Sequence, residues 1–143
     1  MRVSTKTRYS LRALTDLAIH SSDGKPVFLK DIAKREAISV KYLENLFFTL
    51  KKAGILTSIR GAQGGYLLAK DPKDISILNI LEVFEGSLRL VDCEKCLRQS
   101  ICPTIEIYQD ISHKFKSTLS EYSIHTLMDR YIRKKQQAIH YNI

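Results

Sequence analysis

The stretch SVKYLENLFFTLKKAGILTSIRGAQGGYLLA, residues 39–69, combines the pattern of a helix with that of a β-hairpin. Its first half has apolar residues three and four positions apart, which predicts a helix with one buried face over residues 40–53. That face consists of Leu43, Leu46, Phe47 and Leu50. Ser39 is of a type that caps helix N-termini. Two apolar runs joined by a glycine-rich segment then predict paired strands over residues 55–59 and 66–69.

Two further helices are predicted before this stretch. Residues 4–20 carry one apolar stripe, and residues 29–37 predict a short helix that a tight link joins to the next one. A short helix, a tight turn and a second helix with a polar N-terminal face form a helix-turn-helix, and the hairpin makes it a winged helix. The alternative is an all-helical core followed by an ordinary hairpin with a flexible tip.

The positive charge of the chain lies in the same half. Residues 1–70 hold 13 Lys or Arg against 5 Asp or Glu, and residues 71–143 hold 10 of each, so the net charge of +8 belongs to the first half. A solvated basic face would also explain this asymmetry, but the predicted recognition helix and wing coincide with it. We therefore expect the first half to bind double-stranded DNA at an operator.

The predicted DNA contacts come from the start of the second helix and from the hairpin. Glu44 can accept a hydrogen bond from a cytosine amine, and Asn45 can pair with adenine. Arg60 suits a narrow minor groove, and the glycines let the backbone approach phosphates. The complete set is Ser39, Lys41, Tyr42, Glu44, Asn45, Arg60, Gly61, Gln63, Gly64, Gly65 and Tyr66.

The second half predicts a short helix over residues 77–84, an irregular segment to Pro103, and a long amphipathic helix to about Ser120. The apolar stripe of the long helix is Ile105, Tyr108, Ile111, Phe115 and Leu119. Such a stripe needs a partner, which a second copy of the chain would provide. Packing against the N-terminal domain is the alternative, and both can hold along different parts of the helix. The basic tail is expected to be a solvated helix or a frayed end.

All three cysteines, Cys93, Cys96 and Cys102, lie within ten residues. The chain shows no removable leader and no apolar run of bilayer length, so we expect it in a reducing cytoplasm, without a membrane partner. Clustered cysteines there indicate a metal or redox site. The spacing of Cys93 and Cys96 lets both thiolates bind one ion, and a helix N-terminus near Cys102 favours its thiolate. Three thiolates leave a fourth ligand to be found.

Three motifs resemble the Rrf2 family of bacterial winged-helix regulators over about residues 1–120. They are MRVSTKTRYSLRAL (residues 1–14), ISVKYLE (residues 38–44) and RGAQGGYLL (residues 60–68). The resemblance implies a homodimeric transcription factor, most often a repressor, whose long helices pair. It also implies that in sensing members three loop cysteines hold an iron–sulfur cluster, most often of two irons.

The cysteine loop departs from the family pattern. Its first two cysteines are closer together than in the well-known cluster-bearing members. Members similar to IscR place a histidine where this chain has Ile105, and others take an acidic ligand from the first helix, near Arg8 here. The fourth ligand is therefore left open among Asp92, Glu94, Glu106, His20 and His113.

The sequence thus predicts a mainly α-helical fold with a small β-hairpin wing. Residues 1–85 would form the DNA-binding domain, residues 86–103 the sensor loop, and residues 104–143 the dimerisation helix and tail. The expected function is transcriptional regulation through an iron–sulfur cluster. A zinc site or a thiol–disulfide switch is the first alternative. A thiol oxidoreductase is disfavoured because no βαβ unit surrounds the cysteines, and no other catalytic set is visible.

Overall fold

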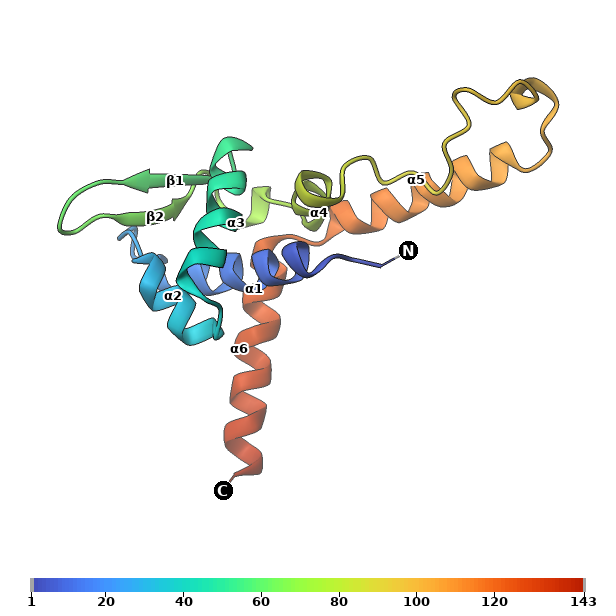
Figure 1. Ribbon diagram of the computed structural model, residues 1–143. Coiled ribbons are helices and arrows are strands. Elements are labelled where there is room, and N and C mark those ends of the chain that lie inside the picture. Colours follow the sequence, from blue (N-terminus) through green and yellow to red (C-terminus); the bar gives the residue numbers. More distant parts are fainter. Residues whose placement is uncertain (1, 143) are drawn as a thin grey trace.

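The computed structural model describes residues 2–142, which form six α-helices, two short 3₁₀ turns and one two-stranded hairpin (Figure 1). This confirms the predicted fold class. In chain order the elements are α1 (Thr5–His20), α2 (Leu29–Glu36), α3 (Val40–Lys52), β1 (Leu56–Ile59), β2 (Gly65–Leu68), η1 (Pro72–Asp74), α4 (Ile77–Glu85), η2 (Gln99–Ile101), α5 (Ile105–Glu121) and α6 (Ile124–Tyr141). Within residues 2–142, each helix is too short or too polar to span a bilayer.

A tight turn joins α2 to α3. Ala37 ends α2 in the left-handed conformation, with φ of 54°, and the Ser39 side chain accepts a hydrogen bond from the Tyr42 amide at the start of α3. This confirms the predicted N-cap. The predicted apolar face of α3 is buried in one core with α1, α2 and β1. Burial of this face fixes which side of α3 remains outward.

The wing is an antiparallel hairpin in which Leu56 pairs with Leu68 and Ile59 pairs with Gly65. Its second strand also pairs with the segment before α2, because the Val27 and Tyr66 backbones exchange hydrogen bonds of 3.0 and 2.8 Å. A Cβ atom at Gly65 would lie 2.5 Å from the Val27 carbonyl oxygen. Glycine is therefore required here for the close approach of two backbones.

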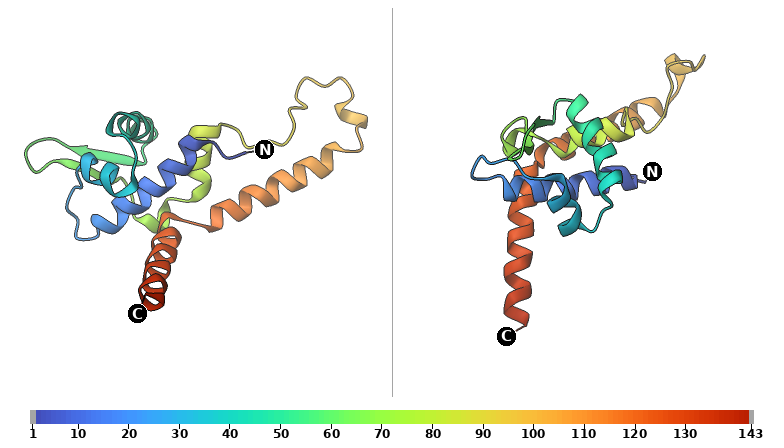
Figure 2. Two further views of the ribbon diagram at one scale, coloured as in Figure 1. Left: turned by 60° about the horizontal axis from the view of Figure 1, so that its bottom comes forward. Right: turned by 60° about the vertical axis from the view of Figure 1, so that its left-hand side comes forward.

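The α5 helix projects from the body of the protein and carries the cysteine loop at its outer end (Figures 1 and 2). Its inner half packs on a small cluster under α4 through Phe115 and Leu119. In its outer half, Ile107 and Ile111 are exposed. The inner half of α5 thus packs against the rest of the same chain, which is one of the two arrangements that the sequence allowed. The apolar side chains of the outer half have no neighbours to cover them among the described residues of a single copy. The helix ends at Glu121, and Tyr122 is extended.

The C-terminal tail is a helix, α6, that begins inside the core. Ser123 and Thr126 form a capping box at its start, and Ile124 is fully buried. Leu127 and Met128 pack against the core beside α1. From Asp129 onward the described residues are exposed, so this part is the solvated helix that the sequence predicts.

Candidate nucleic-acid interface and cysteine loop

The outward face of α3 presents Lys41, Glu44 and Asn45 to solvent. Ser39 is exposed beside them, but its hydroxyl already caps the helix. Tyr42 lies differently, because its ring makes an edge contact with Tyr9 at 6.0 Å between centroids. The structure therefore separates residues that are free to contact a ligand from those that hold the helix.

The wing shows the same division. Arg60, Gly61 and Gln63 are exposed at the tip. Tyr66 instead packs edge-on against Phe47, with ring centroids 5.0 Å apart. Gly64 is buried, and a Cβ there would lie 2.2 Å from the Ile59 carbonyl oxygen.

A cleft of about 500 Å³ lies between the wing and the N-termini of α2 and α3. Its walls include Phe28, Val40, Glu44 and Tyr66. The cleft therefore brings a predicted helix contact, Glu44, close to the base of the wing.

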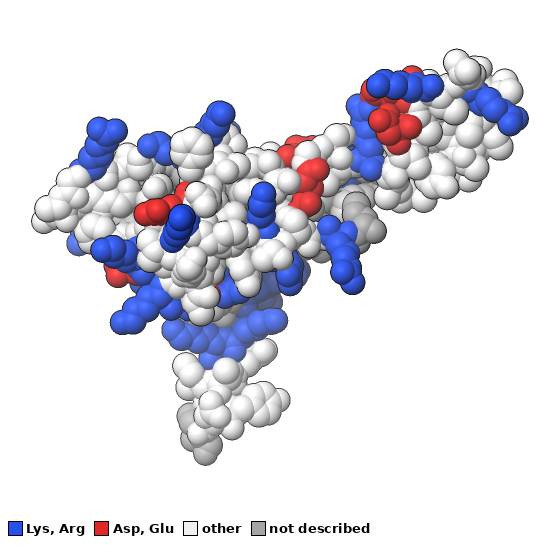
Figure 3. Space-filling view, in the orientation of Figure 1, with Lys and Arg blue, Asp and Glu red and all other residues white. Residues whose placement is uncertain are grey.

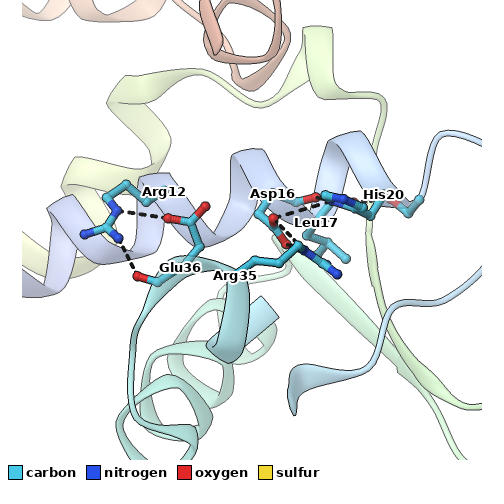
Figure 4. A network of polar contacts seen from close by, with 7 residues as sticks. Arg12, Asp16, Leu17, His20, Arg35 and Glu36 are labelled. Atoms are coloured by element: carbon cyan, nitrogen blue, oxygen red, sulfur yellow. Dashed lines mark hydrogen bonds and ion pairs between the residues drawn. The ribbon is translucent and has the colours of Figure 1, made fainter. Parts of the chain in front are cut away.

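Lys and Arg side chains are spread over the winged-helix body in Figure 3, but some are neutralised by partners. Arg35 donates three hydrogen bonds to the Asp16 carboxylate, of which the shortest is 2.8 Å, and this partner raises the pKa of Arg35. Arg12 pairs with Glu36 at 3.0 Å (Figure 4). These two cations pair with carboxylates across the contact between α1 and α2, which partly neutralises their charge.

Sequence reasoning missed a second polar network, at the other end of α1. The Glu85 carboxylate accepts hydrogen bonds from the Ser4 amide at 2.9 Å, from the Ser4 hydroxyl at 2.6 Å and from Thr7. These bonds lower the pKa of Glu85. They join the start of α1 to Glu85, the last residue of α4, after which the cysteine segment begins. Because Ser4 and Glu85 are 81 positions apart, no local pattern could have found them.

The three cysteines are free thiols on the outer loop, with Cys93 and Cys102 half-buried and Cys96 exposed. The Cys96 amide donates to the Cys93 carbonyl at 3.1 Å, which closes a tight turn between them. Cys102 lies 3.2 Å from the Thr104 hydroxyl. This hydroxyl and the backbone amides at the start of α5, which begins at Ile105, lower the pKa of Cys102, as predicted.

The donor types in this loop suit iron or zinc, but their arrangement does not. Among residues 2–142, no three Cys, His, Asp or Glu side chains are gathered closely enough to hold a metal ion. Metal binding would therefore require the loop to close around the ion.

The candidate fourth ligands are not equally placed. Glu94 and His113 line a cleft of about 410 Å³ together with Cys93, but Glu94 is paired with Arg89. His20 contacts Asp16 at the C-terminal end of α1, whereas the cysteine loop lies beyond the other end of α1 (Figures 1 and 4). Among the described residues, His113 thus shares a cleft with Cys93 and, unlike Glu94 and His20, takes part in no ion pair.

This geometry agrees with comparisons to known proteins. Residues 3–130 match the family described as "Rrf2: Iron-dependent Transcriptional regulator". The chain belongs to the Rrf2 family. It is 38% identical over 132 residues to the HTH-type transcriptional regulator IscR of Photorhabdus laumondii, covering 90% of this chain and 80% of that protein. Identity to protein rrf2 of Nitratidesulfovibrio vulgaris is 39%, covering 90% of this chain and 87% of that one.

The solved structures include a similar Rrf2-type fold, that of CymR, the global cysteine regulator of B. subtilis. It superposes with a TM-score of 0.76 at 32% identity, covering 91% of this chain and 98% of CymR. Family membership confirms the predicted winged helix and a DNA-binding transcriptional regulator rather than an enzyme.

Proposed function

We propose that this Rrf2-family chain is a homodimeric repressor whose affinity for operator DNA is set by an iron–sulfur cluster, of the two-iron type, on the cysteine loop. One observation carries the proposal. All three cysteines of the chain lie, as free and at least partly exposed thiols, in the one loop that links the winged-helix body to α5. A loop placed there can connect a sensed state to a DNA-binding surface.

In this proposal, Lys41, Glu44 and Asn45 meet base edges or flanking phosphates in the major groove, and Arg60 enters the neighbouring minor groove. Gly61 and Gln63 let the wing tip follow the backbone. Ser39, Tyr42, Gly64, Gly65 and Tyr66 act less directly, because they hold α3 and the wing in shape.

The proposed dimer is formed by the outer half of α5. Ile107, Tyr108 and Ile111 leave 58%, 38% and 46% of their surface exposed on this helix, an apolar set that a second copy would cover. The three-part division at residues 85 and 103 remains our proposal, with one addition: the start of α6 belongs to the core of the first part.

Cys93, Cys96 and Cys102 would hold the cluster, with His113 as a fourth ligand from this chain. A bound cluster supplies sensitivity to iron supply and to oxidants. The protein's own part is mechanical, because the loop starts directly after Glu85, whose carboxylate holds the N-terminus of α1. A change in loop conformation is thereby connected to the helix on which α2 and α3 pack.

Anaerobic purification tests this proposal. We expect a coloured protein that contains iron and sulfide, and DNA affinity that changes when the iron is chelated. Cys102→Ser should abolish that change and leave basal DNA affinity intact. A colourless, iron-free protein from anaerobic cells would reject the cluster.

The turn between Cys93 and Cys96 favours a thiol–disulfide switch as the second candidate. In that reaction an oxidant such as diamide takes two electrons and two protons from the two thiols, which form one S–S bond. Mass spectrometry would then show a loss of two hydrogens confined to these residues and accompanied by a change in DNA affinity. Zinc in place of iron would identify the third alternative.

A further inference from the structure

Phe48 is a large aromatic side chain on the surface of α3. It is 70% exposed, whereas the adjacent Phe47 is fully buried against Tyr66. A single exposed apolar residue is common on protein surfaces. The position of Phe48 on the helix, and not its exposure alone, distinguishes it.

Phe48 lies on the same face as the polar residues proposed to contact DNA. At 3.6 residues per turn, positions 41, 44, 45 and 48 fall within a stripe about 100° wide. All four residues at these positions are exposed. They follow the spacing i, i+3, i+4, i+7, at which the recognition helix of homeodomains places its base-reading side chains in the major groove. Lys41, Glu44 and Asn45 are polar, so Phe48 is the apolar member of this set.

We propose that Phe48 is a specificity-determining residue that contacts the 5-methyl group of a thymine in the major groove. This inference rests on the DNA binding proposed for α3. A phenyl ring offers no hydrogen bond to a base edge, and the thymine methyl is the apolar group that the major groove presents. Phe48 lies about two helical turns beyond Lys41, so it selects a thymine at the end of the half-site that lies toward the C-terminus of α3.

The test uses DNA that the full-length wild-type protein selects from a random pool, reduced to its footprint. Each thymine is then replaced singly by uracil, which removes the methyl group and keeps every hydrogen-bonding group. Removing one buried methyl contact should weaken wild-type binding about fourfold per half-site, or about fifteenfold when both half-sites are changed. Phe48→Ala should bind the thymine DNA as weakly as wild type binds the uracil DNA, and should show no further loss with uracil.

Two matched variants complete the experiment. Phe48→Leu keeps an apolar contact and should retain part of the preference for thymine. Tyr141→Ala removes an aromatic side chain that is 92% exposed on α6, and it should bind like wild type. Since Phe48 is outside the core, Phe48→Ala should unfold at the wild-type temperature.

Equal uracil effects in wild type and Phe48→Ala, or no uracil effect at any position, would overturn the inference and leave the proposed function standing if DNA is still bound. Failure of the wild-type chain to select any DNA would overturn both.

Discussion

Arg60 at the wing tip, which we propose to enter the minor groove, offers a direct measure of the positive charge that the wing brings close to the DNA phosphates. Within the described chain it is exposed and takes part in no ion pair. Each neutralised phosphate contributes about 0.9 to the slope of log affinity against log salt, so Arg60→Gln in a dimer should reduce that slope by about 1.8. Over a rise from about 50 to 200 mM salt, wild-type affinity should then fall about twelvefold more than that of the variant.

Fluorescence anisotropy with a labelled operator at several salt concentrations measures both slopes. Arg12→Gln is the matched control, because it removes an equal charge that Glu36 already neutralises. We expect its slope to equal the wild-type slope, with at most about 1 kcal/mol lost from the free energy of unfolding. Equal slopes for wild type and Arg60→Gln would refute the placement of Arg60 in the minor groove, and a reduction near 0.9 would indicate one contacting copy instead of two.

Three further predictions concern stability and the thiols. Hydrogen bonds from Ser4 and Thr7 hold the pKa of Glu85 below its ordinary value of 4.5, so Glu85→Gln should lower the free energy of unfolding by about 1–2 kcal/mol near neutral pH. This difference should vanish as the pH falls through the lowered pKa. Urea unfolding at several pH values tests it, with Glu82→Gln as the control, and a difference that does not depend on pH would contradict it. Gly64→Ala places a Cβ 2.2 Å from a carbonyl oxygen and should lower the free energy of unfolding in urea by about 2–4 kcal/mol. At Gly61, which has φ of 111° and open space around it, alanine should lower this free energy by only about 1–2 kcal/mol. Equal losses at the two positions would show that the hairpin relaxes around the new side chain. In a Cys93→Ser, Cys96→Ser background, Thr104→Val should raise the pKa of Cys102 and slow alkylation of its thiol at neutral pH severalfold, as measured by mass spectrometry. The control Thr118→Val should leave the alkylation rate unchanged. An unaltered rate in Thr104→Val would exclude the Thr104 hydroxyl as the cause of the lowered pKa.

The sequence was most reliable where structure is set by near neighbours. The buried face of α3, its Ser39 cap and the glycine-rich hairpin all follow from residues a few positions apart, and each was predicted within about two positions. The start of α5, at Ile105, lies within one residue of the predicted start beyond Pro103, because Pro103 and Thr104 form a turn directly before the helix.

The candidate DNA surface was predicted as a set of residue types, but not as a division of roles. Tyr66 and Gly65 seemed equivalent to Arg60 in the sequence, yet their contacts with Phe47 and Val27 show that they build the wing. Likewise, a charge count could not show that Arg12 and Arg35 form ion pairs between α1 and α2. Phe48 lies outside the predicted buried face of α3, but it was passed over because a phenyl ring offers no hydrogen bond to a base edge.

The sequence by itself determined the winged helix, the basic half and the grouping of three cysteines, because caps, periodicity and glycine turns act through neighbouring residues. Tertiary structure decided which cations remain free and which half of α5 is uncovered. It also decided that Glu85, at the start of the cysteine segment, binds the N-terminus of α1. These features depend on side chains that are far apart in the chain, and they meet only when burial of the apolar faces fixes how the helices pack.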